Sequence, residues 1–463
     1  MKNIKYTIAL FLVLFFAQAG VAQTSLSSYF LDGTFHNSKL NPAMGAERAY
    51  FSLLAGNLSV GTRGNVGLSD FLYTRSGNEL TTFMSGSVNA DKFLGKLPSV
   101  SKFGFSFDET LFSCGFSAFG GYANLGLSLH SSTMFSLPKE LFEFAKRGLQ
   151  RNSYDISGIN MNSMNYAAFT VGYSREVYKG IRVGANLKYL IGLAHANLDV
   201  DKLSIELGDK YWVAEARASM EAALFGETYA TVDEENVIDG IETGKMSPSS
   251  SGFAIDLGVV YDMDELVPGL TVSASLVDLG YINWKHTVKG HSTGTKVEFD
   301  GFGSVDYDDL ETTVDDEFER LGDDAEEMVK LKYDGVSSQK TSLNTKMYLG
   351  AEYSMPFYKP LSVALLFSHS FSTYENNRWS DFRGYVNVAP LKWFEATLNC
   401  GFNTYGASLG MMLNFHPAGF NFFIGSDHMI TRVSPQFLPV DEFDSHITLG
   451  VNIPIGKLYN NQD

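Results

Sequence analysis

The sequence predicts an all-β fold, a transmembrane antiparallel β-barrel of about 14 strands with a short N-terminal plug-like segment and helical and acidic loop insertions. Long segments alternate apolar residues with small or polar ones. No continuous apolar stretch of membrane-spanning length follows residue 23, which argues against membrane-spanning helices. The composition is rich in Phe, Tyr and Gly, with 36, 23 and 44 of them in 463 residues.

The alternation is clearest over residues 166–193. Every second residue from Ile181 to Leu193 is apolar, and the intervening positions are mostly small or polar. Because side chains of a strand point alternately to its two faces, one face is apolar and the other is suited to a wet lumen. Both strands exceed the five or six residues usual in soluble sheets, and about nine to eleven tilted residues cross a bilayer.

The first 22 residues predict the compartment. Lys2 and Lys5 precede the apolar run 8–17, and small residues lead up to Ala22. This pattern is typical of a secretory signal peptide cleaved after Ala22; the alternative, a membrane-anchoring helix, would need a longer apolar run. Together with the strand pattern it predicts a protein of the cell outer membrane, with lipid as a partner. The net charge of −17 argues against nucleic acid as a partner.

Residues 23–48 are not strand-like and precede the first expected strand, at about 49–60. Asn41-Pro42-Ala43 stands in this segment, and Pro42 predicts a turn or coil because proline lacks the ladder donor. We therefore expect a plug-like segment under or inside the barrel 49–463. The alternative is an ordinary turn at this motif.

An Asn-Pro-Ala motif before the first strand resembles the long-chain fatty-acid transporters of the outer membrane and their relatives. The whole chain is similar to a Bacteroidetes family of predicted outer-membrane barrels, the DUF5723 type. Besides Asn41-Pro42-Ala43, the stretches 137–142, 178–184 and 277–284 carry this resemblance. It implies a small hydrophobic ligand. Residues 31–36 replace the Gly/Ala-rich lead-in usual in the transporters, which puts a fatty-acid site in doubt.

Two insertions interrupt the strand pattern. Near 137–150, apolar residues recur at helical spacing, which predicts a short amphipathic helix in the lumen, plugging the barrel or in an outer loop. Residues 300–330 are dominated by Asp and Glu. We expect a solvated extracellular loop there; a cation site is the alternative, although no calcium-loop register is visible.

Charged residues on the small-residue face are candidates to line the lumen. They could form a path, or they could pair with one another across the lumen. Asp256 would be costly on that face if it were a dry core. Aromatic residues near strand ends, Trp284 among them, suit interfacial girdles. The lumen-lining candidates are Arg182, Lys188, Asp256, Lys346, Glu352 and Glu395.

The sequence carries no strong catalytic signature, so we expect no enzyme, no metal and no cofactor. A Gly-x-Ser-x-Gly match at 406–410 opens an expected strand and lacks the following helix of a nucleophile elbow. His195, His369 and His428 are expected at the wet rim near strand ends. Cys114 and Cys400 each lie on an apolar strand face, which favours lipid-facing thiols over a disulfide.

The expected function is an outer-membrane β-barrel that passes or binds a small hydrophobic molecule. The alternative is a non-transport barrel scaffold that docks a secreted or surface partner through the insertion 300–330, the protein partner being unknown. A secreted soluble β protein is a third possibility.

Overall fold

A computed structural model describes residues 25–46, 48–54, 56–74, 80–148, 151–207, 212–292, 296–299, 330–429 and 445–456. The signal peptide expected at 1–22 lies outside these residues, as does the acidic insertion expected at 300–330 except for its last residue. The short helices are η1 (Leu26–Ser28), η2 (Asn37–Lys39), α2 (Leu68–Phe71), α3 (Ala90–Leu94), α4 (Lys139–Arg147) and η3 (Glu375–Asn377). No helix within the described residues is long and apolar enough to cross a membrane.

The strands of the first half are β1 (Ala49–Leu53), β2 (Leu58–Gly64), β3 (Leu72–Thr74), β4 (Leu80–Thr82), β5 (Val100–Ala118), β6 (Gly121–Pro138), β7 (Ser153–Asp155), β8 (Ile159–Tyr178), β9 (Ile181–Leu207), β10 (Trp212–Leu224), β11 (Thr228–Val232) and β12 (Ile238–Thr243). Those of the second half are β13 (Ser251–Asp262), β14 (Leu270–His291), β15 (Lys296–Phe299), β16 (Lys332–Ser342), β17 (Thr345–Ser354), β18 (Leu361–Phe371), β19 (Trp379–Leu391), β20 (Phe394–Asn403), β21 (Gly406–Phe415), β22 (Asn421–Ser426) and β23 (Ser445–Ile455).

The wall is a closed antiparallel barrel of 14 strands, which confirms the predicted fold class. Three wall strands are each made of two pieces: β1 with β2, β13 with β10, and β17 with β16. The ladder closes because β23 pairs with both β1 and β2. Closure matters because no strand edge is then left for lipid to satisfy.

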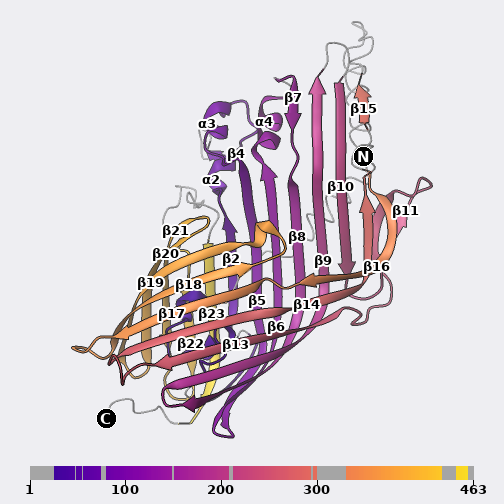
Figure 1. Ribbon diagram of the computed structural model, residues 1–463. Helices are drawn as coiled ribbons and strands as arrows, with labels where there is room; N and C mark the ends of the chain where they lie inside the picture. The colour runs from indigo at the N-terminus through magenta and orange to yellow at the C-terminus, as the bar shows by residue number, and fades with distance from the viewer. Residues whose placement is uncertain are drawn as a thin grey trace.

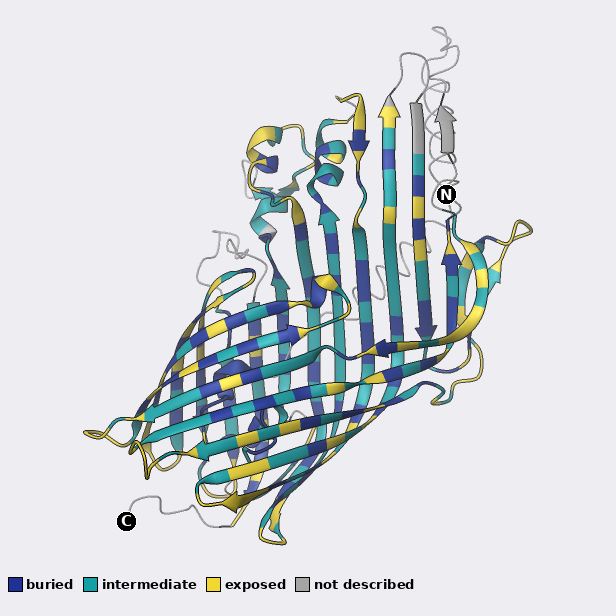
Figure 2. Cartoon of the chain, viewed as in Figure 1, coloured by how far each residue is buried: buried dark blue, intermediate teal, exposed yellow. Residues whose placement is uncertain are grey.

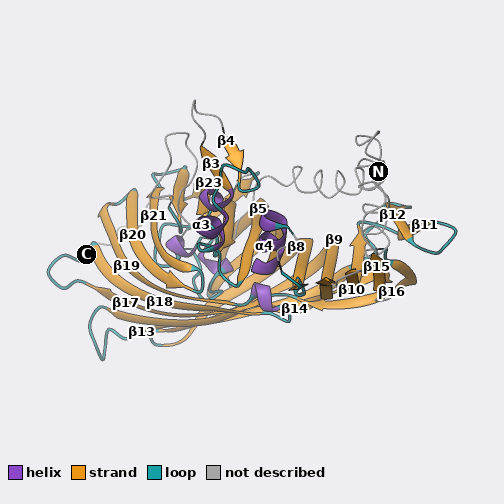
Figure 3. Cartoon of the chain, turned by 90° about the horizontal axis from the view of Figure 1, so that it is seen from above, coloured by secondary structure: helices purple, strands orange, loops and turns teal. Residues whose placement is uncertain are grey.

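The wall is taller on one side than on the other. β9 and β10 rise far above the rest of the barrel in Figure 1, and β9 alone has 27 residues. About nine to eleven residues cross a bilayer, so much of β9 lies beyond it. The connections at the lower end are short, such as the turn between β5 and β6, and this end is periplasmic by the usual rule for such barrels. Seen from above, the short helices lie within the outline of the curved sheet (Figure 3).

The alternation that the sequence shows sets which face meets lipid. Along β9, Val183, Leu187 and Tyr189 are exposed, while Asn186 and Leu190, on the opposite face of the strand, are buried. The same banding of exposed and buried residues follows the other wall strands in Figure 2. The outer surface is therefore apolar and the polar side chains point inward, as an outer-membrane protein requires. Both cysteines are free; Cys114 is half-buried and Cys400 is exposed.

One irregularity changes the direction of side chains. Ile255 of β13 pairs with Leu279 of β14, and Leu257 pairs with Leu276, so Val277 and Asp278 together oppose the single residue Asp256. Asp278 has a φ of 59°, which is unusual for a residue other than glycine. This β-bulge points both Val277 and Asp278 into the barrel.

We expect Leu187→Arg to destabilise the barrel by about 2–4 kcal/mol, because an arginine then faces the hydrocarbon of the bilayer. The side chain of Leu187 is 62% exposed on the outer face. The measurement is urea unfolding in phospholipid vesicles, followed by tryptophan fluorescence. Leu266→Arg is the control, because Leu266 is 66% exposed but lies in the turn between β13 and β14. Equal losses in the two variants would contradict the outer-face assignment.

Candidate functional site

Residues 25–46 of the N-terminal segment lie inside the barrel. Leu26, Tyr29, Phe30 and Leu40 form an apolar cluster with side chains of the wall. The ring of Phe30 meets that of Tyr385 edge-on at 5.1 Å between centroids. The wall members of this cluster are Val277, Tyr348, Ala364, Leu366 and Tyr385. Burial of this many large side chains fixes the segment in one place.

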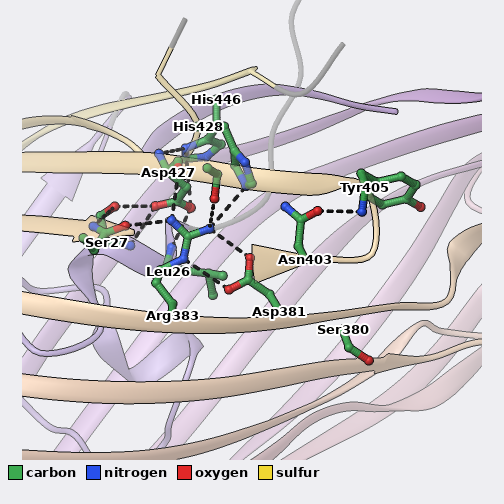
Figure 4. Close-up of polar contacts among 12 residues, drawn as sticks. Leu26, Ser27, Ser380, Asp381, Arg383, Asn403, Tyr405, Asp427, His428 and His446 are labelled. Carbon is green, nitrogen blue, oxygen red and sulfur yellow. Dashed lines mark hydrogen bonds and ion pairs between the residues drawn. The ribbon is translucent and has the colours of Figure 1, made fainter. Parts of the chain in front are cut away.

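The start of the segment is held by Asp427, directly after β22 (Figure 4). The backbone N–H groups of Leu26 and Ser27 and the hydroxyl of Ser25 each donate to its carboxylate at 2.7 Å. The guanidinium of Arg383 donates to the carbonyl of Asp427 at 2.8 Å and to Asp381 at 2.9 Å. Hydrogen bonds to a charged carboxylate are about twice as strong as neutral ones, so this is a firm anchor.

The turn after η1 is held by Glu395 of β20. The N–H of Gly33 donates to both carboxylate oxygens, at 3.0 and 3.1 Å. A Cβ at position 33 would lie 2.7 Å from the ring of His416, so only glycine permits this approach. Glu395, predicted to line the lumen, therefore holds the N-terminal segment.

Asn41-Pro42-Ala43 docks on two glycines of neighbouring strands. The side chain of Asn41 is fully buried; its Oδ1 accepts from Ala43 N at 3.0 Å and its Nδ2 donates to the carbonyl of Val259 at 3.3 Å. Gly184 and Gly258 are paired in register beneath it. A Cβ at Gly258 would lie 2.0 Å from Asn41 Oδ1, and one at Gly184 would lie 2.2 Å from the carbonyl oxygen of Pro42. The motif thus makes a turn and also anchors the segment to the wall.

Beside this docking site, four charged side chains form a continuous network. Lys188 Nζ lies 2.8 Å from Asp256 and 2.6 Å from Asp278. Lys346 Nζ lies 3.5 Å from the other oxygen of Asp278. Asp256 is fully buried, so its charge depends on these partners. Of the lumen candidates, Lys188 and Asp256 pair with each other from neighbouring strands, and Lys346 joins them through Asp278.

The other two predicted lumen residues differ from each other. Arg182 is exposed near the turn that joins β8 and β9. Glu352 is half-buried and accepts from Ser362 Oγ at 2.5 Å and from Asn387 Nδ2 at 3.3 Å. Neither joins the Lys188 network through the contacts found among the described residues.

Two sequence expectations about aromatic and histidine residues are wrong. Trp284 is fully buried rather than interfacial, because the bulge at Asp278 changes which residues of β14 face inward. His195 is buried in the interior of β9 rather than lying at a rim, and its ring stacks on Trp284 at 5.3 Å. His428 is also buried.

Burial lowers the pKa of two residues in the N-terminal segment. Burial lowers the pKa of His36 to about 3, and nearby Lys39 adds to this effect. The ring is therefore neutral, and its Nε2 donates to Asn452 Oδ1 at 3.0 Å. Burial also lowers the pKa of Lys39 to about 8, against the attraction of Asp108. Lys39 Nζ donates to Thr110 Oγ1 at 2.5 Å.

The segment leaves little free space at this level. A cavity of about 70 Å³ is lined by Ser38, Lys39 and Leu40 together with wall residues such as Lys188. A second cavity of about 100 Å³ is lined by Arg63, Trp379, Asn376 and Asn377 among others. Both are bordered by Asp278 and Lys346. Among the described residues no group of three or more His, Cys, Asp and Glu side chains could hold a metal ion.

A larger, apolar groove of about 680 Å³ lies on the outer face of the wall. Leu279 and Tyr281 of β14 stand at the interruption between β16 and β17, and Lys340 Nζ lies 3.6 Å from the centre of the Tyr281 ring. The outward side chains along the groove are Phe169, Val171, Leu187, Tyr189, Phe253, Ile255, Leu279, Tyr281, Lys340 and Ser342. Lys188, whose ammonium joins the inner network, also borders this groove.

The closed wall with its apolar outer face defines an outer-membrane β-barrel, here one whose lumen is occupied by its own N-terminal segment. The model of the family described as "Family of unknown function (DUF5723)" matches residues 42–427, so the chain belongs to that family. No curated protein matches the chain.

Solved outer-membrane barrels are similar in fold. A FadL homologue of Pseudomonas aeruginosa has 10% identity and a TM-score of 0.42, with 94% of this chain and 98% of that chain covered. The toluene transporter TodX of Pseudomonas putida has 7% identity and a TM-score of 0.38, with 95% of each chain covered. The toluene transporter TbuX of Ralstonia pickettii has 10% identity and a TM-score of 0.31, with 92% and 94% covered.

We expect Gly258→Ala to loosen the N-terminal segment, because the new methyl group would overlap Asn41. Overpacking of this kind costs about 1–3 kcal/mol, which corresponds to a roughly 5- to 150-fold larger open population. The measurement is the rate of trypsin cleavage after Lys39, followed by mass spectrometry. Gly126→Ala is the matched control, since its Cβ would meet nothing nearer than 3.7 Å. Equal cleavage rates would contradict the docking role of Gly258.

Proposed function

We propose that the protein binds or passes a small hydrophobic molecule at the outer membrane, and that residues 25–46 act as the plug of its lumen. The outer apolar groove at the interruption between β16 and β17 carries this proposal. Its volume of about 680 Å³ lies within the roughly 300–1,000 Å³ of ordinary ligand sites. The groove opens toward lipid, so a molecule dissolved in the membrane reaches it without crossing water.

The ladder of the wall beside the groove is irregular. β14 pairs with β17 as far as Val277–Lys346 and with β16 from Tyr281–Ser342 onward. Between these two pairs, Leu343 N donates to Gly280 O at 3.0 Å. The N–H of Asp278 donates instead to the carboxylate of Asp256, at 2.8 Å. A wall with fewer ladder bonds needs less energy to open locally. The groove therefore lies beside a point at which local opening of the ladder would connect the lumen with the membrane.

The contacts of the N-terminal segment support its role as a plug. Asp427, Glu395 and Gly258 hold it at three separate points, and two of these are polar anchors. Hydrogen bonds can be exchanged for contacts with water or ligand at little net cost, in contrast to a purely apolar core. Movement of the segment would enlarge the cavity that Ser38, Lys39 and Leu40 now border.

Deleting residues 25–44 is expected to convert a closed barrel into a conducting one. The deletion removes Tyr29 and Phe30 from the lumen, and water can fill the space they leave. The measurement is conductance in planar bilayers. The heat-dependent gel mobility of folded barrels is the folding control, and Gly258→Ala tests the plug without a deletion. A folded deletion variant with unchanged conductance would contradict the plug.

Leu279→Trp is expected to fill the groove and weaken binding of the hydrophobic dye N-phenyl-1-naphthylamine. We expect at least a tenfold loss of affinity, because the indole occupies volume that the dye would use; this equals about 1.4 kcal/mol. The measurement is fluorescence titration of proteoliposomes. Leu398→Trp, on the outer face of β20, is the matched control. Equal affinity in all three proteins would contradict the groove as the binding site.

A further inference from the structure

Three side chains on the lumen face of β5 and β6 remain unexplained by the proposed transport role. Ser128 and His130 are two residues apart on β6, so they share one face of the strand. Asp108 of β5 lies directly opposite His130 in the ladder. Ser128 and Asp108 are buried, and the side chain of His130 keeps 23% of its surface open.

The three side chains are hydrogen-bonded in the order serine, histidine, aspartate, which is the order of a nucleophile, a base and an acid that orients the base. Ser128 Oγ lies 2.8 Å from His130 Nε2. The other ring nitrogen, Nδ1, is in direct contact with a carboxylate oxygen of Asp108. Because Nδ1–H donates to the carboxylate, Nε2 is left to accept the serine proton. The His130 ring also stacks on the ring of Tyr166, with 4.8 Å between the centroids, and this contact fixes the orientation of the imidazole plane.

Free space adjoins the reactive atoms. Ser128 and His130 both line the cavity of about 70 Å³, and Lys39 and Asn124 line it too. An ammonium and an amide are donors of the kind that stabilise a developing oxyanion. His130 and Asp108 also border the cavity of about 100 Å³. An apolar cavity of about 150 Å³ holds benzene, so these spaces suit an acyl group of about four heavy atoms.

We propose that Ser128, His130 and Asp108 form a hydrolytic triad that cleaves small carboxylic esters inside the lumen. Ser128 Oγ bonds to the ester carbonyl carbon while its proton passes to His130 Nε2. The ester C–O bond breaks, and the alcohol leaves with that proton. Water then attacks the carbonyl carbon of the acyl group on Ser128 and gives up a proton to His130 Nε2. The bond from this carbon to Ser128 Oγ breaks, the carboxylic acid is released, and Ser128 takes the proton back from His130. Asp108 acts as a positioning residue for the ring.

The N-terminal segment covers this triad. Ser38, Lys39 and Leu40 line the same cavity as Ser128, so the docked segment limits substrate size. Loosening the segment therefore opens the triad to larger reagents. This activity does not depend on the outer groove, which lies on the opposite face of the wall.

The test uses full-length protein in detergent micelles and diisopropyl fluorophosphate, with mass spectrometry to locate the modified serine. The expected result is a phosphoryl adduct on Ser128, formed faster in Gly258→Ala than in the natural protein. Ser128→Ala should lose the adduct, and Asp108→Asn should form it at least about 100-fold more slowly. Hydrolysis of p-nitrophenyl acetate should fall in parallel.

Ser132→Ala is the matched control, because Ser132 also lies two residues from His130 and lines the neighbouring cavity. It should keep both the adduct and the esterase activity. Heat-dependent gel mobility verifies that each variant is folded. Absence of an adduct on Ser128 in both the natural protein and folded Gly258→Ala would overturn the triad, as would equal labelling of Asp108→Asn. The dye titration reports on the outer groove and the adduct reports on Ser128, so failure of one test leaves the other unaffected.

Discussion

The constraint on which the structure depends is that lipid cannot satisfy a backbone hydrogen bond. The wall must therefore close on itself, and β23 does this by pairing with β1 and β2. Closure fixes an outside and an inside, and lipid then requires the outside to be apolar. Charged side chains of the wall such as Lys188 and Asp256 turn inward. The polar chemistry of the protein is concentrated in the lumen for this reason.

A lumen filled with protein requires that its charges be matched. Lys188 faces Asp256 and Asp278, and Arg383 faces Asp381, because an unpaired buried charge would cost several kcal/mol. The buried backbone N–H groups of the N-terminal segment also need partners, because a donor removed from water must find an acceptor in the protein. Asp427 and Glu395 supply those acceptors. The N-terminal segment and the wall are thus joined by buried polar contacts as well as by an apolar cluster.

The bulge at Asp278 connects the inner and outer faces of the wall. An extra residue in β14 places a second acid in the lumen and leaves the ladder irregular beside the interruption of β16 and β17. The outer groove lies against the same irregularity. A regular strand would provide neither the extra charge nor the local weakness. The bulge therefore has two consequences, one electrostatic and one mechanical.

The alternation in the sequence predicts a barrel of about 14 strands and the face on which Lys188, Asp256, Lys346 and Glu395 lie, because a period of two depends only on neighbouring residues. It also marked Asn41-Pro42-Ala43 as a break before the first strand. Which residues meet depends on strand register, because register joins positions that are distant in the chain. Asp278, Asp427 and the contact of Asp108 with His130 were missed for that reason. Trp284 was misplaced because the bulge inverts the alternation, and a single extra residue in an apolar run leaves no local signal of its own.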